Sequence, residues 1–175
     1  MIVVAIIGIL ASIAIPNYQK YQARSRQTEA KISLAALYTA EQGYVVEAST
    51  YSMCLQNIGY QPTGNLIYYA TGFDGAADTG LCGPTGATAC NQYYSAGTAT
   101  ACAATGSATS AFQYDATAKV AQAAVLTASN TLAGTTMNQS TFTGQAKGNV
   151  TSSGAVYDTW TVNQQKTITN TVSGI

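Results

Sequence analysis

The sequence predicts an α+β protein, in which one long N-terminal helix packs on a mostly antiparallel β-sheet. Residues 1–47 read as a single helix that is apolar at first and amphipathic afterwards. Residues 141–150 and 157–169 alternate as the two strands of an antiparallel pair do. The chain has 175 residues, and the 128 that follow position 47 suffice for one core. We therefore expect two parts, a stem helix over 1–47 and a globular head over 48–175.

The stem helix opens with an apolar segment, residues 1–15, that has no charge and a single hydroxyl. A helix that is apolar around its whole circumference has to be buried on every side, in lipid or among copies of itself. Fifteen residues of helix span about 22 Å, less than the ~30 Å hydrocarbon core of a bilayer. We therefore expect the printed chain to begin a few apolar residues late. The side chains expected to pack in this membrane or assembly core are Met1, Val4, Ile6, Ile7, Ile9, Leu10 and Ile13.

A secretory signal peptide is the alternative interpretation of the apolar segment. Its length suits one, and Ser12-Ile13-Ala14 fits a small-x-small cleavage site. The positively charged leading region is missing, however, and the helical pattern continues past Pro16. We favour one helix with weak points at Gly8 and Pro16, because Gly costs about 1 kcal/mol and Pro roughly 3 kcal/mol in a helix interior. Between these two residues the helix is expected to kink or melt.

Beyond Pro16 the stem helix becomes amphipathic. Its apolar stripe, suited to packing under a sheet, comprises Ile32, Leu34, Leu37, Tyr38, Tyr44 and Val45. Residues 16–31 hold four basic side chains against one acidic, a local balance of +3, and the rest of the chain holds three against six, −3. This basic collar suits lipid headgroups or acidic groups of a neighbouring copy, and it also suits a plain solvated face. Its members are Lys20, Arg24, Arg26 and Lys31.

The head is predicted to be mostly β-structure. A strand is expected within residues 65–73, NLIYYATGF, which end at an Asp-Gly turn signal, and another near 112–114. Residues 74–111 read as a loop with short strands at best, and residues 115–129 read as a short helix. The single tryptophan, Trp160, is expected to pack against the stem helix with Val162 and Ile168. The predicted contact between helix and head is made by Leu34, Leu37, Tyr38 and Trp160.

Four cysteines and no histidine are present. No CxxC pair occurs, so the spacing does not favour a zinc site. An even number of cysteines in a chain whose composition is typical of exported proteins favours two disulfides, for which three connectivities exist. We favour the sequence-local pairing, Cys54–Cys82 with Cys90–Cys102, which would staple the region 54–102.

Catalytic chemistry is not indicated. General acid–base catalysis needs a positioned pair of groups, and the seven acidic residues are scattered. No GxGxxG sits between a strand and a helix, and no P-loop occurs. We therefore predict a chain that is not an enzyme and that uses no cofactor and no metal. A membrane-tethered enzyme is the remote alternative, since no residues stand out to carry a reaction.

The first 31 residues, MIVVAIIGILASIAIPNYQKYQARSRQTEAK, resemble the N-terminal helix of type IV pilins. The segments FTGQAKGNV and DTWTVNQQKTITNTVSGI resemble the last two strands of type IVa pilins, whereas residues 74–138 match nothing in the family. The resemblance implies the type IV pilin fold. It also implies cleavage by prepilin peptidase and methylation of the new amine, both at residues upstream of Met1.

The resemblance further implies a structural role. The chain would be a subunit of a type IV pilus, or fimbrium, a helical fibril of identical copies with the stem helices in its core. Before assembly the stem would lie in the inner membrane with the head in the periplasm, and a machine driven by a cytoplasmic ATPase would extend and retract the filament. Adhesion and twitching motility at the cell surface are the implied roles. In assembled family members the segment matching Gly8 to Pro16 is extended.

Two alternatives share the N-terminal motif. Type II secretion pseudopilins tend to bind calcium in a C-terminal loop, but residues 151–158 offer only Asp158 as a ligand. A DNA-uptake pilin would use Lys119, Lys147 and Lys166 as phosphate contacts. Three lysines are few for this purpose, and we predict no specific nucleic-acid partner. Calcium-dependent head stability and salt-sensitive DNA binding would favour the two alternatives respectively.

Overall fold

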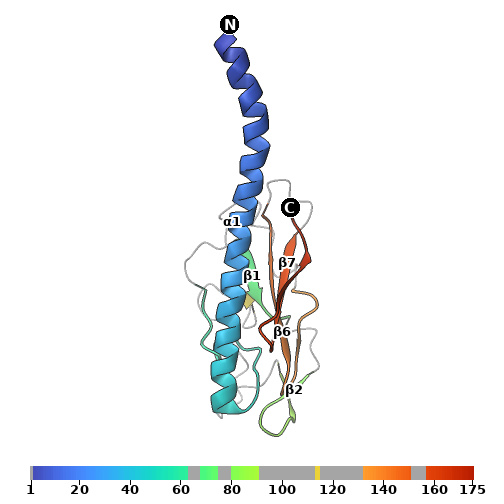
Figure 1. Ribbon diagram of the computed structural model, residues 1–175. Helices are drawn as coiled ribbons and strands as arrows, with labels where there is room; N and C mark the ends of the chain where they lie inside the picture. The colour runs from blue at the N-terminus through green and yellow to red at the C-terminus, as the bar shows by residue number, and fades with distance from the viewer. Residues whose placement is uncertain (1, 63–67, 75–79, 91–112, 115–131, 151–156) are drawn as a thin grey trace.

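A computed structural model describes residues 2–62, 68–74, 80–90, 113–114, 132–150 and 157–175. One helix, α1 (Ile2–Ala48), runs the length of the molecule (Figure 1). Its first part projects beyond the head, and its second part lies along one face of an antiparallel sheet. The predicted α+β arrangement of a long apolar helix on an antiparallel sheet is confirmed.

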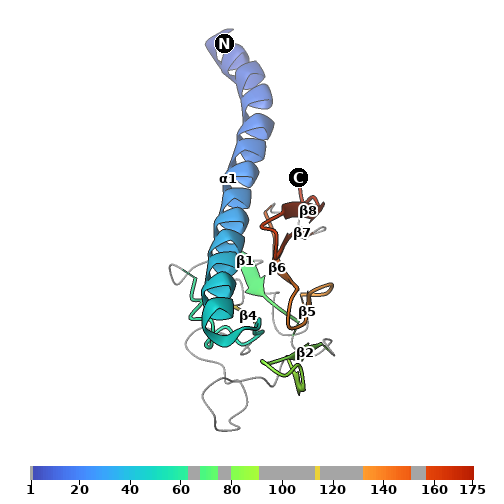
Figure 2. The same ribbon diagram turned by 60° about the horizontal axis from the view of Figure 1, so that its bottom comes forward.

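The sheet has the strand order β4-β1-β6-β7-β8, with β5 pairing β6 away from this path. All of its pairings are antiparallel. The helix contacts the central strands β1, β6 and β7, and the separate hairpin of β2 and β3 lies at the end of the head farthest from the N-terminus (Figure 2). The strand bounds are β1 (Tyr69–Gly72), β2 (Leu81–Cys82), β3 (Thr88–Ala89), β4 (Gln113–Tyr114), β5 (Thr136–Met137), β6 (Phe142–Gly148), β7 (Asp158–Asn163) and β8 (Ile168–Val172).

The predicted pair of strands near the C-terminus is present as β6 and β7, with Ala146 opposite Trp160. The single strand expected over 157–169 is wrong, because the chain turns after Asn163 and returns as β8. The Asn163 carboxamide accepts hydrogen bonds from the backbone N–H groups of Gln165 and Thr167, and Lys166 adopts a left-handed φ of 61°. Asparagine favours such turns because its side chain bonds the backbone two residues on.

The remaining predicted elements have mixed outcomes. Strands are present at Tyr69–Gly72 and Gln113–Tyr114, within or overlapping the predicted segments. The short strands expected between 74 and 111 include β2 and β3. The helix expected over 115–129 lies outside the described residues.

The core lies between α1 and the sheet. The helix buries Ala23, Ala30, Leu34, Leu37, Glu41 and Tyr44, which recur three, four or seven residues apart. Ile32 was expected among them but is 61% exposed, because a position two residues from both Ala30 and Leu34 faces the other side of the helix. Tyr38 and Val45 pack at the border of the core.

Small residues let the helix approach the sheet closely. In β6, a Cβ added at Gly144 would lie only 2.7 Å from Cδ2 of Leu37. Beside this contact, the Phe142 ring lies 4.8 Å from the ring of Tyr51 and 6.3 Å from that of Phe73, centroid to centroid. Aromatic pairs at these separations add to the stabilisation from burial itself.

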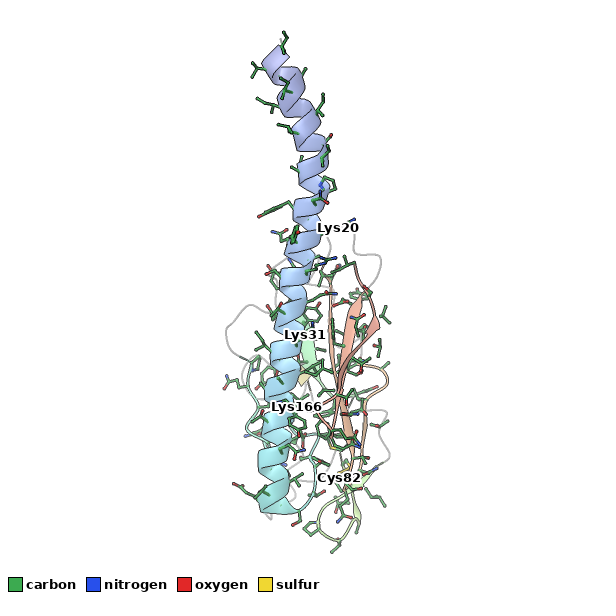
Figure 3. The ribbon with its side chains drawn as sticks, viewed as in Figure 1. Lys20, Lys31, Cys82 and Lys166 are labelled. Carbon is green, nitrogen blue, oxygen red and sulfur yellow. A yellow bond between two sulfur atoms is a disulfide. The ribbon has the colours of Figure 1, made fainter. Side chains whose placement is uncertain are left out.

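The favoured disulfide pairing is wrong. Cys82 of β2 is bonded to Cys90, and their Cα atoms lie 4.8 Å apart (Figure 3). The hairpin explains this pairing, because Cys82 faces Thr88 across the two strands and Cys90 follows two residues later. Cys54 is also disulfide-bonded. Cys102 lies outside the described residues.

Gly148, in β6, offers a test of close strand packing. A Cβ there would lie 2.5 Å from the carbonyl oxygen of Tyr68, so backbone has to shift to admit it. We expect Gly148→Ala to lower the free energy of unfolding by about 1–3 kcal/mol. Gly43→Ala, in open space on the helix, should raise it by about 0.5–1 kcal/mol. Denaturant titration of the detergent-solubilised full chain measures both, and equal stability of the two variants would contradict the packing described.

Candidate assembly surface and its attachment to the head

The apolar segment of α1 presents large side chains to solvent on all sides. Figure 3 shows them projecting from the part of the helix beyond the head. Each is more than half exposed: Ile2, Val3, Val4, Ile6, Ile7, Ile9, Leu10, Ile13 and Ile15. Of the predicted assembly residues, only Met1 lies outside the described residues. The helix is long and apolar enough to cross a bilayer, and an exposed apolar surface of this extent marks a membrane or protein contact.

The two predicted weak points lie within unbroken helix. α1 passes through Gly8 and Pro16 as one element, with a gentle curve and no sharp kink (Figure 2). Pro16 has no N–H, so it cannot donate to the carbonyl four residues back. Ser12 bonds within this stretch, donating its hydroxyl to the carbonyl of Ile9 at 2.7 Å. A break between Gly8 and Pro16 stays a prediction for the assembled state.

The head holds the helix through the carboxylate of Asp158, the first residue of β7, which is fully buried. Its Oδ1 accepts hydrogen bonds at 3.0 Å from the Gln27 side chain of α1, the Asn170 side chain of β8 and the backbone N–H of Gly174. The helix α1, the strands β7 and β8, and the C-terminal residues therefore meet at Asp158.

The second oxygen of Asp158, Oδ2, accepts from the Tyr69 hydroxyl of β1 and from Trp160 Nε1 at 2.6 Å. Burial pushes the pKa of Asp158 up, but the hydrogen bonds from Tyr69, Gly174, Trp160 and Asn170 outweigh it, and the pKa lies below 3.8. Burial and the adjacent Asp158 raise the pKa of Tyr69 far above its usual range. The carboxylate is thus ionised and the tyrosine stays a neutral donor.

Polar residues of α1 complete the attachment on the same side. Arg26 Nη1 donates to the carbonyl of Val150 at 2.8 Å, and its guanidinium lies 4.9 Å from the centroid of the Tyr68 ring. The Glu29 carboxylate accepts from the backbone N–H of Tyr68. Lys31 Nζ lies 4.8 Å above the Trp160 ring, a cation–π distance (Figure 3). Part of the predicted basic collar therefore faces the head, whereas Lys20 and Arg24 are exposed.

Comparison with curated proteins adds a family to this architecture. The chain is 57% identical over 70 residues to the type IV major pilin protein PilA of Myxococcus xanthus, covering 39% of this chain and 32% of that protein. It is 57% identical over 47 residues to a fimbrial protein of Pseudomonas aeruginosa, covering 27% and 30%. It is 43% identical over 72 residues to the type IV major fimbrial protein FimA of Dichelobacter nodosus, covering 41% and 44%.

These relatives, at 43–57% identity, support a type IV pilin. The matched part spans about a third of the length of the first two relatives and less than half of the third. No family model matches the chain.

The lysines considered as phosphate contacts lie apart in the structure. Lys147 Nζ lies 5.2 Å above the Tyr157 ring, and Lys166 Nζ lies 5.6 Å above the Tyr38 ring. Lys119 falls outside the described residues. Within the part of the chain that the structure describes, no three His, Cys, Asp or Glu side chains gather to hold a metal ion.

Glu41 is a second buried acid that the sequence reasoning missed. It lies fully buried on the face of α1 that packs on the sheet, and its Oε2 accepts from the backbone N–H of Ser52 at 3.4 Å. Its Oε1 has no hydrogen-bond partner. Burial raises the pKa of Glu41 well above 4.5, against the weaker opposing effect of Ser52. Its spacing from Leu34, Leu37 and Tyr44 was the signal that places it in the core.

Asp158→Asn tests the attachment of α1 to the head. The amide keeps the shape but turns one acceptor oxygen into a donor facing donors, so we expect a loss of about 3 kcal/mol in the free energy of unfolding. Because the folded pKa is lowered, the stability from ionised Asp158 is present above its unfolded pKa of about 3.9 and is lost as pH falls through the folded pKa. In denaturant titrations, the difference in free energy of unfolding between wild type and variant should therefore become smaller below about pH 4.

The matched control is Glu47→Gln, which removes an exposed carboxylate from the end of α1. It should change stability by no more than about 0.5 kcal/mol. If Asp158→Asn lowered the free energy of unfolding by the same amount from pH 7 to pH 2, the charge of Asp158 would not contribute to the attachment.

Glu41→Gln should have the opposite pH dependence. Because the folded pKa of Glu41 is raised, its protonated form contributes fully to the stability of the fold below the unfolded pKa of about 4.3. This contribution is lost as pH rises through the folded pKa. Glutamine does not titrate, so the variant should gain on wild type by about 1 kcal/mol or more between pH 5 and pH 8. Thermal or denaturant unfolding across this range measures the gain, and parallel pH profiles of the two proteins would refute it.

Proposed function

We propose that this pilin is the structural subunit of a type IV pilus, a filament of identical copies joined through their stem helices. The observation that carries the proposal is the apolar segment of α1, whose large side chains nothing in the described head covers. Burying one such side chain stabilises by about 1.5–3 kcal/mol, so nine contribute on the order of 20 kcal/mol before association costs of about 4–15 kcal/mol. The residues proposed to pack the filament core are Met1, Val4, Ile6, Ile7, Ile9, Leu10 and Ile13.

The same segment supports a membrane-anchored form before assembly. We propose that the stem lies in the inner membrane with the head in the periplasm, and that a dedicated assembly machinery then moves the subunit into the filament. The length and composition of α1 suit a membrane span. The hydrogen bonds around Asp158 support transfer of helix and head as one body. We also propose the division into a stem over 1–47 and a head over 48–175.

Surface location, adhesion and twitching motility are proposed for the filament. The surface location is supported by the relatives, which are named as pilins and fimbrial proteins. We propose in addition that the helix between Gly8 and Pro16 unwinds on assembly. Glycine and proline are the residues at which a helix loses least by opening.

The two alternative functions have less support. A calcium site that uses Asp158, as in a pseudopilin, would compete with five hydrogen bonds already made to its two oxygens. A DNA-uptake pilin would need its lysines grouped to contact phosphates. Lys147, in β6, and Lys166, in the turn between β7 and β8, instead each lie over a separate tyrosine ring. The relatives named as major pilins also favour the main filament subunit.

Ile7→Asp tests the proposed function. A charge in the middle of the apolar segment costs about 2.5–3.5 kcal/mol at the centre of a bilayer helix, and it has no partner in a core of apolar stems. We expect surface filaments to disappear in electron micrographs of cells that produce this variant. The head should stay folded, because Ile7 is 60% exposed and lies far from it.

The control is Ile7→Leu, which keeps the side chain apolar and should leave filaments abundant. Mass spectrometry of the sheared fibres identifies the subunit and its N-terminal residues. Abundant fibres from Ile7→Asp that contain this chain would overturn the proposed function.

A further inference from the structure

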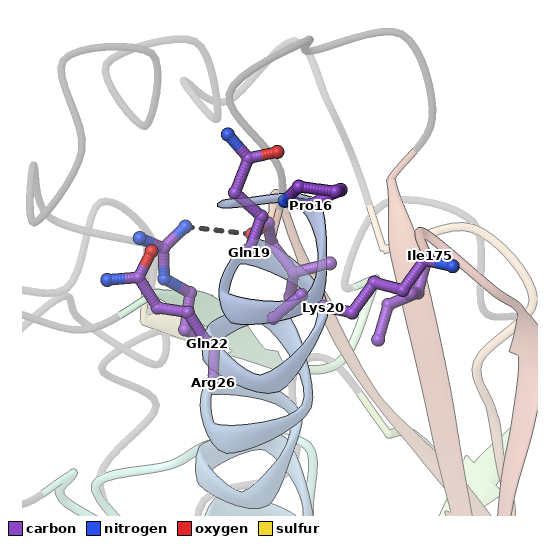
Figure 4. Close-up of a pocket in the computed structure, with 8 residues that line it drawn as sticks. Pro16, Gln19, Lys20, Gln22, Arg26 and Ile175 are labelled. Carbon is purple, nitrogen blue, oxygen red and sulfur yellow. Dashed lines mark hydrogen bonds between the residues drawn. The ribbon is translucent and has the colours of Figure 1, made fainter. Parts of the chain in front are cut away.

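A cavity of about 360 Å³ lies where α1 enters the head. Figure 4 shows it between the first polar turns of the helix and the last residue of the chain. Its volume falls within the range of small-molecule sites. The lining residues that matter are Pro16, Gln19, Lys20, Gln22, Arg26 and Ile175.

The polar lining of this cavity suits an anion. Lys20 and Arg26 supply two positive charges and the amides of Gln19 and Gln22 supply neutral donors, against one negative charge on the terminal carboxylate of Ile175. The lining therefore keeps a net positive charge. Arg26 is half-buried and held in place by its bond to the carbonyl of Val150 (Figure 4). That bond uses one of the five N–H donors of the guanidinium, and phosphate is a group that arginine binds well.

The cavity sits at a defined level of the helix. The apolar segment ends at Ile15, and the lining begins with Pro16. Tyr18 and Tyr21, on the turns that follow, are 67% and 71% exposed. Exposed tyrosines and basic residues at the end of an apolar span are typical of the headgroup region of a membrane. This level follows from where the apolar segment ends, whatever precedes Ile2.

We propose that this cavity binds the phosphate of an anionic phospholipid headgroup while the pilin is anchored in the membrane, and the proposal rests on the membrane anchoring proposed above. Lys20 closes on the phosphate from the exposed side, and Arg26 receives it at the wall next to the head. Free phosphate shares this chemistry, but a headgroup is delivered to the cavity by the position of the stem in the bilayer. A bound headgroup fixes the depth and rotation of the stem relative to the membrane surface.

The test uses the full chain reconstituted into vesicles of phosphatidylcholine with 20 mol% phosphatidylglycerol. After extraction in mild detergent at physiological salt, mass spectrometry measures the ratio of the two lipids that stay bound. Extraction and salt remove the diffuse attraction of the surface, since exposed charges are screened over about 8 Å. We expect phosphatidylglycerol to be enriched over its share of the vesicle.

Lys20→Gln and Arg24→Gln form a matched pair of variants. Both remove one positive charge from exposed side chains one turn apart, but only Lys20 lines the cavity. Loss of a charge-assisted hydrogen bond predicts that Lys20→Gln lowers the enrichment about tenfold. Arg24→Gln should change it by less than about twofold. Helix content from circular dichroism confirms that both variants are folded.

The other outcomes distinguish this proposal from the anchoring on which it rests. The headgroup site would be overturned if Lys20→Gln and Arg24→Gln lost phosphatidylglycerol enrichment equally, or if wild type showed no enrichment. The membrane anchoring would still stand in either case if the chain partitions into vesicles of pure phosphatidylcholine. Failure to enter either vesicle would overturn both. If inorganic phosphate bound the cavity of the lipid-free chain as tightly as phosphatidylglycerol does, the lipid would be overturned as the source of the phosphate. Normal lipid ratios together with loss of fibres in Lys20→Gln would assign the cavity to a neighbouring subunit instead.

Discussion

The structure depends on one buried carboxylate. Asp158 gathers donors from α1, β1, β7, β8 and the C-terminal residues, so five separate stretches of chain share a single negative charge. Among the described residues, the apolar segment lies exposed beyond the head, and the head holds α1 through the half that follows Pro16. Apolar packing at Leu34 and Leu37 supplies adhesion between the two. Among the directional bonds to Asp158, the one from Gln27 ties the helix to the sheet.

Two buried acids show how donors decide ionisation. Asp158 has five hydrogen bonds and a lowered pKa, whereas Glu41 has one long bond from Ser52 and a raised pKa. Burial opposes the charge in both, so the difference comes from the number of N–H and O–H groups that point at each carboxylate. The chain therefore carries one acid whose charge the surrounding donors favour and another whose charge burial opposes, both beneath the same helix.

Periodicity along the chain was enough to predict α1, the strands β6 and β7, and the contacts of Leu34 and Leu37. It failed where the outcome depends on residues far apart. Ile32 is apolar and was therefore grouped with the buried stripe, but it lies two residues from both Ala30 and Leu34 and so faces away from the sheet. The turn at 163–167 depends on a side chain bonding its own backbone, which alternation does not reveal. The burial of Asp158 cannot be predicted from its neighbours in the sequence, because its donors lie up to 131 residues away. The burial of Glu41 could have been predicted from its helical spacing to the apolar stripe.

The hairpin closed by Cys82 and Cys90 is fastened to the head by hydrogen bonds from Gln139 to Gly83 and Pro84 and from Gly83 to Thr50. It occupies the end of the molecule opposite the apolar segment (Figure 2). Because this bridge spans a separation of eight residues, it removes somewhat less entropy from the unfolded chain than a bridge closing a longer loop would. Breaking this one bridge would consequently loosen the hairpin at the far end of the head, while the packing of α1 on the central strands, which does not include the hairpin, would persist.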